Sequence, residues 1–248
     1  MRETIYGRNA VYETLKANRR LVYKLFVAEG VQEKGNLAEA LKIAAQRSIP
    51  VQRVKRETLD HQTDSHQGLM AEVNSYPYAG IEDILDLAKQ RTEPPLILFL
   101  DVIQNPQNLG TLLRTAEAVG VHGVVIPQRR GVEVTQAVVN ASSGASEHLL
   151  IAQVVNLVVT MTDLKQQEIW ITGLDNLPEA KSIEEADLAG AIGLVVGNEG
   201  EGMRRLVRES CDFLVKLPMR GQMESLNAAV AGSIVLYEIL RQRMRSRP

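Results

Sequence analysis

Short apolar runs alternate with amphipathic stretches along the second half of the chain. The run at 96–102 is apolar almost throughout and has strand length, which is typical of a parallel strand buried on both faces. Further strands are predicted at 123–126, 149–154, 169–172, 192–196 and 213–217, with helices at 109–119, 135–141, 156–167, 203–209 and 225–241. This alternation predicts an α/β domain built on a parallel sheet with crossover helices.

The first 75 residues carry a smaller version of the same pattern. Helical spacing at 8–17 and 37–46 alternates with strand-like runs at 21–27, 50–54 and 69–73. This predicts a small α/β/α sandwich. Proline and glycine interrupt the pattern at 76–80 and again at 92–95. We therefore expect domains at 1–75 and 95–248, joined by a linker at 76–94.

Composition and charge narrow the class of protein only a little. The single cysteine, Cys211, rules out an intrachain disulfide, and no apolar run approaches membrane-spanning length. The charged start has no signal-peptide pattern, so a soluble cytoplasmic protein is expected. The net charge is −2, although residues 1–75 hold 12 Lys and Arg against 9 Asp and Glu. Basic regions of this size are equally typical of solvated surfaces and of phosphate contacts.

The first candidate segment follows the strand at 96–102 and reads NPQNLGTLLRTA. Ligands bind at the carboxyl ends of strands in open α/β sheets, so polar residues there are candidate ligand contacts. Asn108 stands where a helix N-cap is expected. Arg114 lies among small and apolar residues, where a guanidinium needs an anionic partner. A phosphate ligand and a buried structural salt bridge fit Arg114 equally well.

A second segment, GNEGEG at 197–202, follows the strand at 192–196. Its glycines permit a ligand to approach the backbone, although a simple turn is the alternative. The spacing is neither a dinucleotide-binding fingerprint nor a P-loop.

The third segment, LPMRGQMESLN at 217–227, joins the last strand to the last helix. Ser225 is expected to cap that helix, and Asn227 is unusual among apolar neighbours. Val230, Ile234, Tyr237 and Leu240 share one face of the helix, which is typical of a core or a dimer interface.

Other chemistry finds no support in the sequence. The four histidines have no metal-ligand spacing with one another or with Cys211, so no metal is expected. Cys211 is interpreted as a buried or half-buried structural thiol.

Together, the three segments resemble the signature motifs of the SpoU (TrmH-like) branch of the SPOUT methyltransferases. Those motifs run N-x-G-x-x-x-R-T/S-A, G-x-E-x-x-G and P-M-x-G-x-x-x-S-L-N, and here they stand as NLGTLLRTA, GNEGEG and PMRGQMESLN. The front unit, with IYGRNAVYETL and SHQGLMAEV, resembles the ribosomal-protein-L30e-like substrate-binding domain of bacterial 23S rRNA guanosine-2′-O-methyltransferases. The resemblance covers essentially the whole chain.

The resemblance implies more than the residue pattern does. It implies a deep trefoil knot in the second domain, S-adenosylmethionine bound at the knot, and a homodimer with the active site near the subunit interface. The cofactor-binding residues carried over are Gly197, Leu217, Leu226, Thr172, Gly173, Met219 and Asn227. The catalytic and structural polar set is Arg114, Asn108, Glu199, Ser225 and Asn227.

The implied reaction is methyl transfer to the ribose 2′-hydroxyl of a guanosine in 23S rRNA. The family account makes the arginine the general base, but a guanidinium stays protonated in proteins. Arg114 is therefore either deprotonated within the complex or holds an RNA phosphate while another group or water takes the proton.

Two other functions compete with this reading. A tRNA 2′-O-methyltransferase shares the motifs but usually lacks the front domain, and a non-catalytic RNA-binding ribosome-assembly factor would be expected to lose Arg114 or Asn227. A nucleotide-binding oxidoreductase lacks its fingerprint here.

Overall fold

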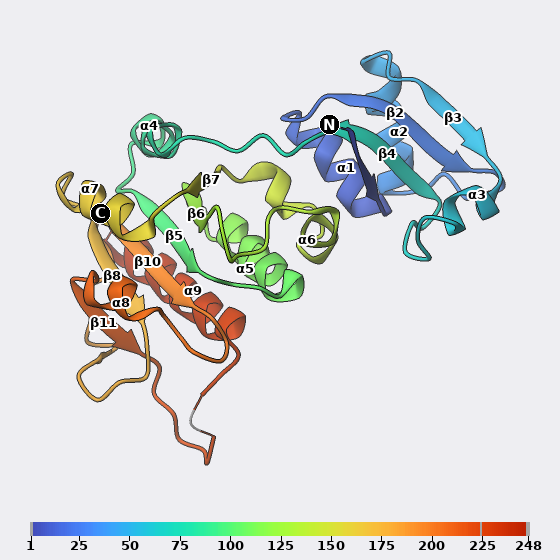
Figure 1. Cartoon of the computed structure of the whole chain (residues 1–248). Coiled ribbons are helices and arrows are strands. Elements are labelled where there is room, and N and C mark those ends of the chain that lie inside the picture. Colours follow the sequence, from blue (N-terminus) through green and yellow to red (C-terminus); the bar gives the residue numbers. More distant parts are fainter. Residues whose placement is uncertain (1, 224, 247–248) are drawn as a thin grey trace. The chain divides into compact units, whose positions relative to one another are not determined.

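The chain divides into two compact units in a computed structural model (Figure 1). The structure describes residues 2–223 and 225–246. Unit 1 comprises the described part of Met1–Pro77 together with Val134–His148, and unit 2 comprises Tyr78–Glu133 and the described part of Leu149–Pro248.

Unit 1 is built on a four-stranded sheet in the order β1-β4-β2-β3. The β1–β4 and β4–β2 pairs are antiparallel, whereas β2 and β3 are parallel. Its elements are β1 (Arg2–Tyr6), α1 (Arg8–Ala17), β2 (Val22–Ala28), α2 (Asn36–Gln46), β3 (Val51–Val54), α3 (Arg56–Asp60), β4 (Leu69–Asn74), α6 (Gln136–Ala141) and the 3₁₀ helix η1 (Ala145–His148).

The alternation of side chains along β2 explains how helices pack on this sheet. Leu25 and Val27 are completely buried. Phe26 and Ala28 point the opposite way, because side chains alternate across a strand, and they pack with Leu59 of α3. Helices therefore lie on both faces, as the predicted sandwich requires. The sequence analysis missed β1, because the polar segment RETIY shows little apolar alternation.

The segment Val134–His148 lies in unit 1, although the sequence analysis expected residues 95–248 to form one domain. Buried polar contacts explain the difference. The Arg20 Nε lies 3.0 Å from the Glu147 Oε2, and both side chains are almost fully buried. The Tyr76 hydroxyl donates to the Ser146 carbonyl at 2.8 Å. An ion pair between residues so distant in sequence leaves no periodic pattern.

Unit 2 contains a seven-stranded sheet in the order β7-β6-β5-β10-β8-β11-β9, and every pairing is parallel. Its strands are β5 (Leu96–Asp101), β6 (Gly123–Pro127), β7 (Ile151–Val154), β8 (Trp170–Leu174), β9 (Lys181–Ser182), β10 (Ile192–Gly197) and β11 (Phe213–Lys216). Its helices are α4 (Ile81–Arg91), α5 (Pro106–Ala118), α7 (Leu157–Lys165), α8 (Arg205–Glu209) and α9 (Ala228–Ser246). The predicted α/β fold with a parallel sheet is confirmed, and the trefoil knot stays a prediction.

Helices cover both faces of this sheet (Figure 1). One face packs Phe99 and Val195 against residues of α4, α7 and α8 in the main apolar core. The other face meets α5 and α9. A Cβ added at Gly232 of α9 would lie 2.8 Å from the Leu112 Cδ2 of α5 and 3.0 Å from the Val196 Cγ2 of β10. The glycine therefore lets α9 approach α5 and the sheet closely.

The expected linker at 76–94 contains a helix that belongs to unit 2. Ile84 and Leu85 of α4 are buried in the main core of that unit. The helix was anticipated at 81–90, but its packing was not. Among the described residues, no helix is long and apolar enough to span a membrane.

Candidate active site

The first motif begins where β5 ends, and its two asparagines have different roles. The Asn105 side chain accepts a hydrogen bond from the Gln107 backbone N–H at 2.8 Å, and Pro106 occupies the first position of α5. Asn105 is therefore the N-cap, and the expectation that Asn108 caps this helix was wrong. The reason is that proline is favoured directly after a cap, which moves the cap three residues earlier.

Asn108 instead links the three motifs to one another. Its side-chain Nδ2 donates to the Glu199 Oε1 of the second motif. Its Oδ1 accepts a hydrogen bond at 3.2 Å from the Nδ2 of Asn227 in the third motif. Three segments separated by up to 119 residues of sequence thus meet in one hydrogen-bonded chain. We call Asn227, Asn108 and Glu199 the amide–carboxylate chain.

Asn227 also caps α9. Its Oδ1 accepts from the backbone N–H groups of Ala229 at 2.9 Å and Val230 at 3.2 Å. The prediction that Ser225 caps this helix was wrong, since the helix begins three residues later, at Ala228. The cap orients the Asn227 amide, because its oxygen is engaged by the helix and its nitrogen must point elsewhere. That nitrogen points to Asn108.

The second motif forms a closed loop at the end of β10. Asn198 and Gly202 exchange two backbone hydrogen bonds of 3.0 Å. A Cβ added at Gly197 would overlap the backbone of Gly202 and Met203, so only glycine fits there. The loop is fixed to β5 because the Arg204 backbone N–H and Nε each donate to the buried Asp101 carboxylate at 2.7 Å. Glu199 therefore projects from a rigid loop.

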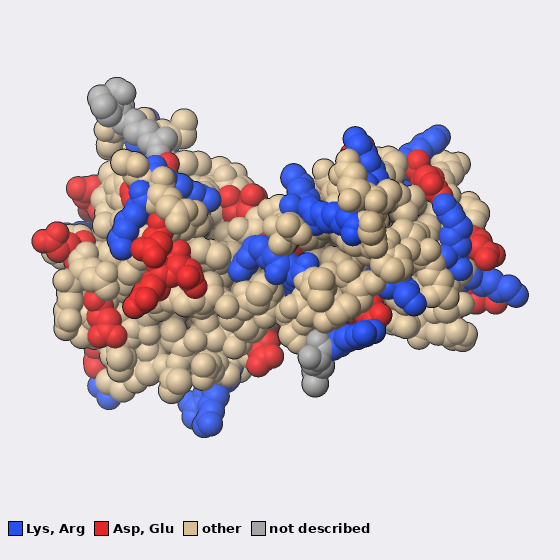
Figure 2. Space-filling model, turned by 90° about the horizontal axis from the view of Figure 1, so that it is seen from above, with Lys and Arg blue, Asp and Glu red and all other residues tan. Residues whose placement is uncertain are grey.

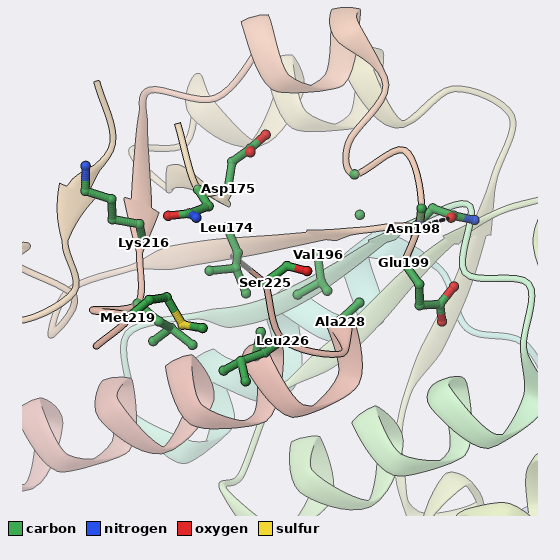
Figure 3. A pocket seen from close by; sticks show the side chains of 16 residues that line it. Leu174, Asp175, Val196, Asn198, Glu199, Lys216, Met219, Ser225, Leu226 and Ala228 are labelled. Carbon is green, nitrogen blue, oxygen red and sulfur yellow. Dashed lines mark hydrogen bonds between the residues drawn. The ribbon is translucent and has the colours of Figure 1, made fainter. Parts of the chain in front are cut away.

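A cavity of about 250 Å³ opens at the carboxyl ends of β8, β10 and β11 (Figure 3). Its lining combines apolar side chains, two carboxylates and glycine backbone. It includes six residues singled out from the sequence: Gly197, Glu199, Leu217, Met219, Ser225 and Leu226. In Figure 3 the Asp175 and Leu226 side chains lie on opposite sides of the cavity.

Other residues of the lining were not anticipated, among them Asp175, Asn176, Val196 and Lys216. The strand β8 was expected to end at Thr172 but continues to Leu174. Residues that follow a parallel strand tend to meet ligands, so the correct strand end would have found Asp175 and Asn176. Thr172 and Gly173 themselves lie within β8 and are buried, next to the lining rather than in it.

Arg114 lies on the second and third turns of α5 and is exposed to solvent. The buried structural salt bridge considered for it is therefore ruled out. Its neighbour Thr115 contacts Ser233 of α9, with 2.9 Å between the hydroxyl oxygens. Arg114 is not part of the cavity lining.

The environment of Cys211 excludes it as a nucleophile. Burial raises the pKa of the Cys211 thiol to about 12, so the thiol stays protonated at neutral pH. A Cβ added at Gly173 would lie 3.0 Å from its Sγ. The predicted structural thiol is thus half-buried and packed beneath β8. The described residues contain no group of three or more His, Cys, Asp and Glu side chains suited to a metal ion.

Charges are mixed on the surface of the molecule. Figure 2 shows Lys and Arg side chains interspersed with Asp and Glu side chains on one face, in keeping with a net charge of −2. The exposed side of α9 is apolar: Val230 is 46%, Ile234 44% and Tyr237 54% exposed. These are three of the four residues whose shared helix face indicated a core or a dimer interface.

Known proteins resemble the chain over both halves. Residues 95–237 match the family described as the SpoU rRNA Methylase family, and residues 4–79 match the family described as RNA 2′-O ribose methyltransferase substrate binding. YacO of Bacillus subtilis (strain 168), whose name places it in the TrmH family of tRNA/rRNA methyltransferases, is 45% identical over 96% of this chain and 95% of its own length.

Two solved structures are also similar. The SpoU methyltransferase AviRb from Streptomyces viridochromogenes, in complex with AdoMet, has a TM-score of 0.82 and 22% identity, and the match covers 99% of this chain and 92% of AviRb. The TrmH/SpoU tRNA-modifying enzyme of A. aeolicus has a TM-score of 0.56 and 29% identity, and the match covers 66% of this chain and 84% of the enzyme.

Proposed function

The chain belongs to the SpoU rRNA methylase family, and on this premise we propose that it methylates the ribose 2′-hydroxyl of a guanosine in 23S rRNA. The methyl donor is S-adenosylmethionine. The observation that carries the proposal is the amide–carboxylate chain, which joins all three family motifs beside one cavity.

The cavity fits this cofactor by the chemistry of its lining. The cofactor has a flat apolar base, ribose hydroxyls and a cationic end. Leu174, Val196 and Leu226 offer apolar walls to a base, while the Asp175 and Glu199 carboxylates offer acceptors for hydroxyl and ammonium groups. We assign cofactor contacts to Gly197, Leu217, Leu226 and Met219, which line the cavity. Asn227 adjoins Leu226 and supports this wall through its hydrogen bond to Asn108, and Thr172 and Gly173 lie behind the wall.

The bound cofactor supplies an electrophilic methyl group on a sulfonium. The residues of the chain must then place a ribose hydroxyl in line with this methyl group. Ideal alignment alone can lower the activation free energy by about 7–11 kcal/mol. The amide–carboxylate chain holds Glu199 at the cavity, and the hydrogen bond from Asn108 engages only the Oε1 of its carboxylate. Ser225 lines the same space and can donate to a ribose or phosphate oxygen.

Arg114 is assigned to phosphate binding, the second of its two possible roles. An exposed guanidinium keeps its charge and matches the geometry of a phosphate. The 2′-hydroxyl proton then passes to water or to another group. Arg114 would in this way fix the RNA at the rim of the cavity without itself acting as the base.

The rRNA substrate is favoured over tRNA by unit 1. The A. aeolicus tRNA-modifying enzyme matches only 66% of this chain, whereas the substrate-binding family covers residues 4–79. A separate domain with its own sheet adds surface for folded RNA, which proteins recognise by shape and by unpaired bases.

A homodimer is part of the proposal. The apolar face of α9 exposes three large side chains next to the α5–α9 contact. A second copy of the chain would bury this face and bring two cavities near one interface. Arg114 of one subunit and the cavity of the other would then be able to serve the same RNA.

A transfer assay tests the proposed function. The purified chain is incubated with labelled S-adenosylmethionine and separate pools of unmodified 23S rRNA, 16S rRNA and tRNA, and any 2′-O-methyl group is mapped by its resistance to alkaline cleavage. We expect label at one guanosine of 23S rRNA. Label in tRNA would retain the reaction but refute the substrate. Absence of label from these pools and from ribosome precursors, with cofactor binding intact, would favour a non-catalytic assembly factor.

A further inference from the structure

The turn that follows β6 carries two adjacent arginines, Arg129 and Arg130. Arg129 and Arg130 are exposed, and within residues 2–223 and 225–246 neither makes a hydrogen bond or an ion pair. Three other arginines of unit 2 form ion pairs: Arg204 binds Asp101, Arg205 binds Glu209, and Arg241 binds Glu238. The turn therefore presents two uncompensated positive charges.

The backbone of this turn is held at both ends. The Gln128 N–H donates to the Val154 carbonyl at 2.9 Å, and the Val132 N–H donates to the Ile103 carbonyl at 3.0 Å. Between these anchors, Arg130 has φ of 69°, a left-handed conformation that ordinarily favours glycine or asparagine. An arginine at such a position has no evident benefit for the fold.

The turn adjoins the first motif. Strand β6 pairs with β5, so the two loops leave the sheet at neighbouring carboxyl ends. Gly131 and Val132 line the same small internal space as Ile103 and Leu109, and Leu109 directly follows Asn108. The Val132–Ile103 hydrogen bond joins the turn to the loop that leads to Asn108. The arginine pair is thus fixed to the wall that supports the amide–carboxylate chain.

Exposed, unpaired guanidinium groups on an anchored turn suit the phosphate backbone of an RNA substrate. Phosphate contacts position an RNA strand without reading its bases, and arginine is the residue best shaped for them. The one carboxylate in the following residues, Glu133, is exposed and forms no ion pair with either arginine. We propose that Arg129 and Arg130 bind phosphates of the substrate RNA and hold the strand at the methyl-transfer cavity. This inference rests on the proposed function.

The test compares two double variants with the same change of charge. Arg129→Gln with Arg130→Gln removes the proposed contacts. Lys89→Gln with Arg91→Gln removes two exposed charges from α4, which leads into the opposite, amino end of β5. A third variant, Arg129→Gln with Arg130→Gly, relieves the left-handed backbone and controls for folding.

We expect the turn variants to raise the KM for 23S rRNA transcript roughly 10- to 100-fold, the range for losing charge-assisted hydrogen bonds. The slope of log(1/KM) against log[salt] should become less steep by about 1.4, because each phosphate contact on a single strand contributes about 0.7. Cofactor affinity and kcat at saturating RNA should stay unchanged. No turn variant should unfold at a lower temperature than wild type, and the α4 variant should match wild type in KM and salt slope.

The inference is overturned if the turn variants have the KM and salt slope of wild type. It is also overturned if the α4 variant raises the KM for RNA as much as the turn variants do. The proposed function fails separately, if the wild-type chain transfers no methyl group to any RNA. In that case fluorescence anisotropy with the labelled 23S transcript still tests the arginines, because it measures binding without turnover.

Discussion

Asn227 serves both the fold and the proposed site, and two substitutions separate these roles. Its oxygen caps α9 through two backbone N–H groups, and its nitrogen donates to Asn108. Asn227→Ala removes both functions. Asn227→Asp retains the capping oxygen and removes only the donor. The pair of variants therefore isolates the contribution of the amide–carboxylate chain.

The expected loss of stability follows from the cap. Removing an Asn cap reduces the free energy of unfolding by about 1 kcal/mol, so Asn227→Ala should be destabilised by that amount. Asn227→Asp should be as stable as wild type or more stable by about 0.5 kcal/mol, because a carboxylate interacts favourably with the N-terminus of a helix.

The expected loss of activity follows from the number of donors. The Asn108 amide has acceptors on both sides in Asn227→Asp, a carboxylate at 227 and the carboxylate of Glu199. The Asn108 NH₂ group points to Glu199, so its Oδ1 would face the new carboxylate with no donor between them. An unsatisfied polar group costs about 1–3 kcal/mol when buried. Asn227 is exposed and Asn108 half-buried, so the lower end applies, and we expect kcat/KM to fall about tenfold.

The assays are urea unfolding followed by circular dichroism and methyl transfer to 23S rRNA transcript. Both variants should lose activity, but only Asn227→Ala should lose stability. If Asn227→Asp methylates RNA at the wild-type rate, the amide–carboxylate chain has no role in the reaction. If it is as unstable as Asn227→Ala, the capping argument is incorrect.

Four further predictions follow from individual residues. Arg114→Ala should reduce methyl transfer at least 100-fold, whereas its affinity for S-adenosylmethionine, measured by calorimetry, should stay unchanged. Unaltered turnover would refute the role of Arg114 in binding RNA phosphate. Gly197→Ala should weaken cofactor binding at least tenfold, because its Cβ would overlap the Gly202 and Met203 backbone; wild-type affinity would contradict this. Burial lowers the pKa of His122 in the folded chain, so below about pH 6.5 the unfolded chain binds more protons than the folded chain. The free energy of unfolding should therefore fall as the pH drops. In acid unfolding, His122→Asn should show a smaller fall than wild type. Ile234→Glu on the exposed face of α9 should yield a monomer in sedimentation, where an unchanged dimer would place the interface elsewhere.

Much of the fold follows from local patterns. The apolar run of β5, the glycine-rich loop after β10 and the long amphipathic α9 were located from sequence, because buried strands and helices impose periodicity on neighbouring residues. The short β9 and the polar β1 were missed because two or five residues on a sheet edge need little apolar character. The starts of α5 and α9 were each misplaced by three residues, because Asn108 and Ser225 were taken as the helix caps. Residues that can cap a helix are frequent in loops, and each of these two loops contains several.

The sequence by itself determined the alternation of strands and helices, the three motifs and the residue types that chemistry requires. Tertiary structure alone decided that Asn227 donates to Asn108 and Asn108 to Glu199, and that Arg20 pairs with Glu147 across 127 residues. It also decided that Asp175 enters the cavity, and that the turn carrying Arg129 and Arg130 packs through Val132 against the loop leading to the first motif. Periodicity records which face of an element is buried, whereas contacts between distant segments depend on strand order, and strand order leaves no trace in local spacing.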